Sequence, residues 1–195
     1  MSHQSGGIRG AALRPFVRWY AGVHGEAGLN RALSPLSERD RRRFDSSAPG
    51  LGIERSSWYP APLIHQMLDG LLEGLDPAGR RRLSESGADA AIETSLNGIL
   101  SVAFRIVVSP RVCALVGPQI WNAFYSSGRV RIQALGSRSH RMEVRDWDGH
   151  HAFLCQMNNA AGRAIYQAAG CRNVSTEHAA CIDRGDDGCA YIIRW

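Results

Sequence analysis

The chain has 195 residues, a length that suits one domain spanning 1–195. Hydrophobic residues make up 44% of it and charged residues 21%, which excludes collagen-like, mucin-like and mainly disordered chains. All 23 basic residues are arginine, so mechanisms that need a lysine, such as a Schiff base or a phosphate-loop lysine, are excluded as well.

The net charge of +5 is mild and does not indicate a nucleic-acid partner. Acidic residues are interleaved with two arginine triplets, 41–43 and 80–82, which are predicted to be solvated helix faces. The polar N-terminus does not resemble a signal peptide, and the longest apolar stretch, 98–108, is too short to span a membrane. Five cysteines without a secretion signal favour buried thiols or a metal site over disulfides. We therefore expect a cytoplasmic protein.

Helical periodicity dominates the first part of the chain. Hydrophobic residues recur at helical spacing over 11–24 and 27–36. Ser37 and Asp40 form a capping pair that predicts a third helix ending near residue 45.

The loop at 46–57, which holds glycine and proline, is a candidate boundary between a helical N-terminal segment (1–50) and a ligand-binding type of core (51–195). Beyond it, a capping residue followed by proline marks two helix starts, and a wide apolar face marks another. These three helices are predicted to begin at Pro60, Asp76-Pro77 and Ser109-Pro110.

Beyond residue 127 the hydrophobic period changes from helical to alternating. Val130, Ile132 and Ala134 alternate with polar residues, which predicts a half-buried strand paired in a hairpin with 142–146. A helix with a small-residue face is predicted at 152–169, and a second hairpin joins 171–183 to 189–195. This order predicts an α+β fold, in which a helical N-terminal half packs on a small antiparallel sheet.

Two cysteines, Cys181 and Cys189, are placed symmetrically about the turn of the C-terminal hairpin. Residues so placed are cross-strand neighbours with Cβ atoms about 4.5–5.5 Å apart. Two thiolates at that separation can share a tetrahedral zinc ion, although the same geometry could close a disulfide. Cys155 and His178 are the candidates for the remaining zinc ligands, and thiols buried as small hydrophobic side chains are the alternative. In a regular strand His178 and Cys181 point to opposite faces, so His178 reaches the metal only if the strand bends or bulges.

The run 177–193 resembles the ending of 4-vinyl-reductase-type domains, with an acidic residue, two spacers, a cysteine, a seven-residue loop, a second cysteine and an alternating apolar strand. Those domains share a superfamily with haem–nitric-oxide-binding domains and Golgi transport-particle subunits, and they include the sensor domains of aromatic-responsive transcription activators. The resemblance implies a structural zinc held by Cys155, position 178, Cys181 and Cys189. Position 178 is histidine here where the family pattern has glutamate, and histidine is also a competent zinc ligand.

The layout of the whole chain also resembles an uncharacterised family of proteins of similar length that is typical of myxobacteria. The features that carry this resemblance are Arg9-Gly10, Trp58-Tyr59-Pro60, Trp121 and Trp195.

Several histidines have competing interpretations. The run Asp148-Gly149-His150-His151 could be a metal or acid–base cluster, but its place before a helix predicts that Asp148 is an N-cap. His65 is interpreted as a satisfied or surface histidine rather than a ligand. Either His65 or His140 could serve as the axial ligand of a haem, although no haem motif accompanies them.

No common catalytic motif is present, so the chain is not predicted to be an enzyme; a zinc- or thiol-dependent enzyme is the third hypothesis. The first hypothesis is a stand-alone sensing or binding module for a small apolar or aromatic molecule, with a structural zinc, a homodimeric state and a separate output protein. The second is a ligand-free protein-interaction or dimerisation module. The candidate pocket residues, for each of which core packing is the competing role, are Trp58, His65, Met67, Phe104, Trp121 and Phe124.

Overall fold

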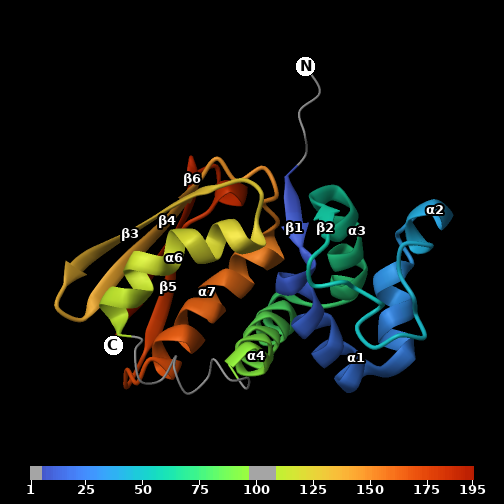
Figure 1. Ribbon diagram of the computed structural model, residues 1–195, viewed down its shortest axis with the longest axis horizontal. Helices are drawn as coiled ribbons and strands as arrows, with labels where there is room; N and C mark the ends of the chain where they lie inside the picture. Colours follow the sequence, from blue (N-terminus) through green and yellow to red (C-terminus); the bar gives the residue numbers. More distant parts are fainter. Residues whose placement is uncertain (1–5, 97–108) are drawn as a thin grey trace.

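Figure 1 shows the computed structural model, which describes residues 6–96 and 109–195. Phe104 and the apolar stretch 98–108 lie outside the described residues. The first part of the chain contains β1 (Gly7–Arg9), α1 (Gly10–Leu33), α2 (Glu38–Arg41), β2 (Trp58–Pro60), α3 (Ala61–Leu72) and α4 (Pro77–Leu96). The second part contains α6 (Pro110–Phe124), β3 (Arg129–Gly136), β4 (Ser139–Arg145), α7 (Ala152–Ala168), β5 (Ser175–Ala180), the 3-10 turn η1 (Ile182–Arg184) and β6 (Gly188–Arg194). Helices and antiparallel strands are combined as predicted, so the α+β class is confirmed.

The N-terminal helices begin close to their predicted positions. The first two predicted helices form one element, α1, which is kinked at Gly25, where the backbone has φ 61°. Ser37 caps α2 by accepting a hydrogen bond from the Asp40 N–H at 3.2 Å. Helix α2 is only one turn long and ends before the predicted residue 45.

Capping also explains the starts of the later helices. Asp76 Oδ1 accepts from the Gly79 N–H at 2.6 Å, and Ser109 Oγ accepts from the Val112 N–H at 3.4 Å. The prediction that Asp148 caps α7 is wrong, because the cap is His151, whose Nδ1 accepts from the Phe153 N–H at 3.2 Å. A turn closed by the His150 N–H on Trp147 O delays the helix past Asp148.

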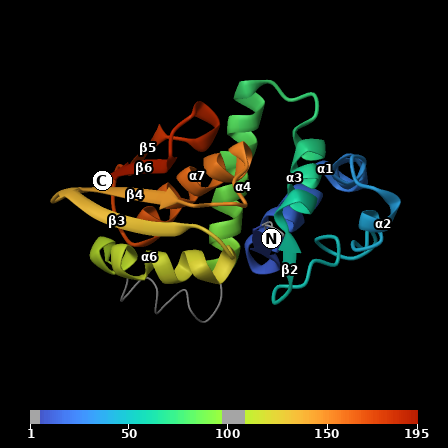
Figure 2. The same ribbon diagram turned by 90° about the horizontal axis from the view of Figure 1, so that it is seen from above.

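The sheet positions both long C-terminal helices. Its strands are antiparallel in the order β3-β4-β6-β5. A Cβ atom on Gly162 of α7 would lie 3.2 Å from Ile193 Cδ1, and one on Gly117 of α6 would overlap the Ile132 side chain. Ile132 and Ile193 are on the same face by register, so α6 and α7 cover one face of the sheet, as Figures 1 and 2 show.

One irregularity in β5 bears directly on the cysteine cluster. The pairing with β6 changes register between His178, opposite Tyr191, and Ala180, opposite Ala190. This extra residue is a β-bulge, and it reverses the alternation of side chains beyond it. His178 and Cys181 can therefore face the same side of the sheet, which a regular strand would forbid.

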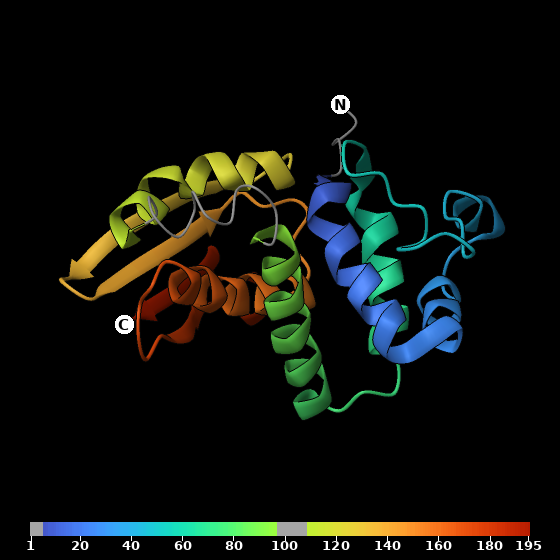
Figure 3. The same cartoon turned by 60° about the horizontal axis from the view of Figure 1, so that its bottom comes forward.

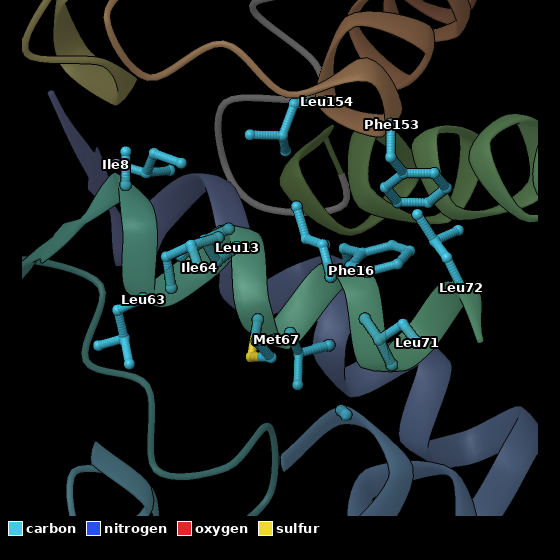
Figure 4. Close-up of a cluster of buried hydrophobic side chains, with 14 of the residues drawn as sticks. Ile8, Leu13, Phe16, Leu63, Ile64, Met67, Leu71, Leu72, Phe153 and Leu154 are labelled. Carbon is cyan, nitrogen blue, oxygen red and sulfur yellow. The ribbon is translucent and has the colours of Figure 1, made fainter. Parts of the chain in front are cut away.

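A single hydrophobic core joins the N-terminal helices to the sheet layer. Helix α3 contributes Leu63, Ile64, Met67 and Leu71 to this core, which Figure 4 shows together with Phe16 of α1. Phe16 is 1% exposed, and its ring centroid lies 5.6 Å from that of Phe153 at the start of α7. Figure 3 shows α4 between these two regions, and it contacts both α1 and α7.

None of the helices in 6–96 and 109–195 has the length and hydrophobicity that crossing a membrane would require.

We expect Phe16→Ala to lower the free energy of unfolding by about 3–5 kcal/mol, because it empties a buried aromatic site between α1 and α7. Urea denaturation would measure the change. Val23→Ala on the same helix is the matched control, since Val23 is 59% exposed and its truncation should cost within about 0.5 kcal/mol. Equal effects of the two changes would contradict the described packing.

Candidate functional site: a thiol cluster and an apolar cavity

Three cysteine thiols meet where α7 begins against the C-terminal hairpin. Cys155 lies in the first turn of α7, Cys181 directly follows β5, and Cys189 lies in β6. Their side chains are buried, with Cys155 and Cys189 no more than 1% exposed. Cys155 Sγ lies 3.1 Å from Cys189 Sγ and 3.8 Å from Cys181 Sγ. Sulfur atoms bound to one tetrahedral zinc lie about 3.8 Å apart, as those of Cys155 and Cys181 do, whereas Cys155 and Cys189 are closer and would have to separate slightly around a shared ion.

Two imidazoles adjoin the thiols. His150, in the loop before α7, has Nε2 3.6 Å from Cys181 Sγ, and one of its ring nitrogens and the three sulfurs lie within 4.8 Å of one another. His178 Nε2 lies 3.1 Å from Cys155 Sγ, and its ring stacks on Tyr191. His178 is thus beside the cluster but is not in the group of mutually close donors, whereas His150 is.

The position of Asp183 favours His150 as a metal ligand. Its carboxylate lies 3.5 Å from His150 Nδ1, on the side of the ring away from Cys181. A carboxylate behind a ligating histidine fixes the ring orientation and makes the metal-facing nitrogen more basic. The sequence missed this arrangement because His150 reaches the hairpin through a turn, and the only local signal was the Asp148–His151 run.

The thiols share protons rather than titrating independently. The Cys155 thiol donates to the Cys189 sulfur, which lowers the pKa of Cys189 and raises that of Cys155. Burial raises the pKa of Cys155 further, and burial also raises that of Cys181. The Tyr191 hydroxyl lies 3.0 Å from Cys155 Sγ and adds a polar partner to the cluster. A cation would neutralise the buried thiolate charge that such a group generates.

A partly enclosed cavity of about 150 Å³ lies between α4, α6, α7 and the inner face of the sheet. Its walls are mostly apolar, from residues such as Val116, Ile132, Met142, Ile165 and Ile193. A wider hollow of about 530 Å³ lies on the surface near Asp69, Glu73 and Arg80, where it is open to solvent. The cavity between the helices and the sheet is the better candidate for a small apolar ligand, because it is more enclosed than the surface hollow and removes more of the ligand surface from water.

The groups that border the cavity are uncharged. Among the described residues that line it there is no aspartate, glutamate, arginine or histidine. Burial raises the pKa of the Cys113 thiol to about 11 and that of the Tyr125 hydroxyl to about 12, and it also raises the pKa of Tyr166. All three groups are therefore protonated at neutral pH.

The predicted pocket residues lie in different places. Trp121 and Phe124 border the cavity. Met67 is fully buried in the core, and Trp58 is 45% exposed beside the Arg9 guanidinium. His65 Nε2 lies 3.2 Å from Gly149 O, away from the cavity.

Comparison with solved structures shows that the chain is similar to H-NOX domains. An H-NOX protein mutant from K. algicida, in the unliganded Fe(II) state, matches with a TM-score of 0.67 and 11% identity over 96% of each chain. An H-NOX protein from S. oneidensis in the Fe(II)NO ligation state matches with a TM-score of 0.63 and 11% identity, over 96% of this chain and 98% of that chain. An oxygen-binding H-NOX domain related to soluble guanylate cyclases matches with a TM-score of 0.62 and 9% identity, over 96% and 94%.

These matches show that the chain has the fold of H-NOX domains, as the superfamily of the sequence resemblance implies. The sequence matches no protein-family model and none of the curated proteins. The likeness to 4-vinyl-reductase-type domains and to the myxobacterial family therefore depends on the sequence motifs alone.

The described residues do not fit a haem. Pockets for drug-sized ligands occupy about 300–1,000 Å³, and this cavity has only about 150 Å³. The two histidines considered as axial ligands are engaged elsewhere, since His140 Nδ1 lies 2.5 Å from the Tyr166 hydroxyl and His65 bonds to Gly149.

Buried His140 makes stability depend on pH. It is 5% exposed, and burial lowers its pKa below the usual value of 6.5. As the pH falls below about 6.5, His140 takes up a proton in the unfolded chain but not yet in the folded chain. The folded state therefore loses stability relative to the unfolded state as the pH falls.

We expect His140→Gln to flatten this loss between about pH 7.5 and pH 5.5, because it removes the group that titrates in the unfolded state. Denaturant unfolding at a series of pH values would measure the slope. If the free energy of unfolding of the variant falls with pH as steeply as that of the wild-type protein, whatever its absolute value, His140 is not the source of the pH dependence.

Proposed function

We propose that this chain is a small-molecule binding domain that holds a compact apolar or aromatic ligand in the cavity between α6, α7 and the sheet. The observation that carries the proposal is a partly enclosed cavity of about 150 Å³ with predominantly apolar walls. A cavity of that size with apolar walls has room for a benzene-sized molecule. The H-NOX fold supports a binding rather than a catalytic role, since the similar structures are described by their ligation and oxygen-binding states.

We also propose that the thiol cluster holds one structural zinc through Cys155, Cys181, Cys189 and one histidine. Four protein ligands leave no open coordination position, which argues against zinc-dependent catalysis. The donor geometry favours His150 as the fourth ligand, and the sequence resemblance favours His178.

The alternative function, a ligand-free interaction module, requires a filled interior. The cavity bordered by Trp121 and Phe124 does not meet that requirement, so ligand binding is the better-supported function. Size-exclusion chromatography of the purified protein, with and without ligand, would test whether the chain forms the expected homodimer.

Metal analysis tests the zinc assignment. We expect about one zinc per chain in the purified protein, and we expect Cys181→Ser to lose it because three donors remain. Cys171→Ser is the matched control, since Cys171 is outside the cluster and should keep the metal. His150→Gln and His178→Gln distinguish the two candidate ligands. Only the variant that lacks the zinc-binding histidine should lose the metal. Absence of metal from the wild-type protein in zinc-supplemented medium would overturn the assignment.

Ligand-induced stabilisation tests the cavity. We expect benzene at ten times its Kd to raise the free energy of unfolding by about 1.4 kcal/mol, and Ala161→Leu to abolish the effect by occupying the cavity. Gln167→Leu introduces the same side chain at an exposed position of α7 and should bind benzene normally. The absorption spectrum of the same sample tests the competing ligand, because a haem band would overturn the apolar-cavity proposal.

A further inference from the structure

The cavity contains few polar groups, and most are already committed to protein partners. The Trp121 indole N–H donates to Ser127 O at 2.9 Å. The Tyr166 hydroxyl lies 2.5 Å from His140 Nδ1, which is a short contact even between strongly bonded groups. The Cys113 thiol is only a weak hydrogen-bond donor. These three residues therefore offer little to a polar group on a ligand.

Tyr125 and Asn158 are different, because their hydrogen-bonding capacity is not used up. The Tyr125 hydroxyl lies 3.4 Å from Asn158 Oδ1 and 3.3 Å from Asn158 Nδ2. Both distances are longer than the usual 2.7–3.0 Å, and one hydroxyl cannot satisfy an amide that has two N–H donors and an acceptor oxygen. No other side-chain or main-chain partner of the Asn158 amide occurs within the part of the chain that the structure describes.

We propose that the Tyr125–Asn158 pair determines the ligand class of the cavity: an uncharged molecule the size of one six-membered ring that bears a single hydrogen-bonding group. This inference rests on the proposed function and adds the position and chemistry of the polar contact. The hydroxyl and amide together can donate to and accept from one group, such as an alcohol. The cavity walls supply the contacts to the ring.

The described lining of the cavity disfavours charged ligands. No ionised side chain borders the cavity in the described part of the chain, so a bound carboxylate or ammonium group would be desolvated without a counter-ion. Burial of an unpaired charge is far more costly than burial of a neutral polar group that keeps its hydrogen bonds. An alcohol should therefore bind where the ammonium compound of the same shape does not.

Three ring compounds of matched shape test the proposal: methylcyclohexane, cyclohexanol and cyclohexylammonium. They do not absorb where tryptophan does, so the fluorescence of Trp121 and Trp147, whose ring centroids lie 4.9 Å apart, can report binding. We expect cyclohexanol to bind roughly 3- to 10-fold more tightly than methylcyclohexane, the contribution of one net hydrogen bond, and cyclohexylammonium not to bind.

Two variants locate the polar contact. Asn158→Leu and Tyr125→Phe should each remove the preference for cyclohexanol and leave methylcyclohexane affinity within about 2-fold, because the cavity walls are kept. Asn159→Leu is the matched control, since Asn159 is the next residue of α7 and does not border the cavity. Loss of the preference in this control would contradict the assignment.

The outcomes separate this inference from the proposed function. If the wild-type protein binds all neutral rings equally, or if Asn158→Leu keeps the preference, the polar contact is overturned while ligand binding stands. If neither methylcyclohexane nor cyclohexanol binds, the proposed function itself fails. Binding of cyclohexylammonium as tight as that of cyclohexanol would overturn the exclusion of charge.

Discussion

The packing of α7 against α4 and the sheet is the constraint on which both candidate sites depend. The helix approaches β6 closely because Gly162 has no side chain, and a Cβ atom there would press on Ile193. Its first turn delivers Phe153 to the core and Cys155 to the hairpin cysteines, and the next turn places Asn158 beside the cavity. A shift of α7 would therefore disturb the core, the thiol cluster and the cavity together.

The thiol cluster favours a buried negative charge, whereas the cavity is lined by neutral groups, although the two are only one turn of α7 apart. The hydrogen bond from the Cys155 thiol lowers the pKa of Cys189 and so favours a buried thiolate, whose charge the nearby imidazoles and a cation would balance. The described residues that line the cavity are instead neutral, because burial keeps the Cys113 thiol and the Tyr125 hydroxyl protonated. Tyr191 lies between the two regions: its hydroxyl contacts Cys155, and its strand forms part of the inner face of the sheet.

The fold and the residues of this chain support different ligands. The similar solved structures are H-NOX domains, and an iron ligation state is given for two of those compared above. In this chain α6 carries Cys113 and Trp121 toward the interior, no histidine borders the cavity in the described residues, and the space is small. The contents of this site therefore depend on its own residues, since fold alone does not determine the contents of a site.

Local signals in the sequence were sufficient for most elements. Caps at Ser37, Asp76 and Ser109 form within a few residues, and hairpin symmetry alone indicated that Cys181 and Cys189 would be neighbours. What only the tertiary structure decided depends on contacts between distant segments. The bulge in β5 turns His178 inward, the turn after Trp147 brings His150 to the thiols, and the approach of α6 to α7 leaves Tyr125 and Asn158 around one cavity. Periodicity determines which face of an element is buried, but it does not determine which residues of two buried faces meet or what space remains between them.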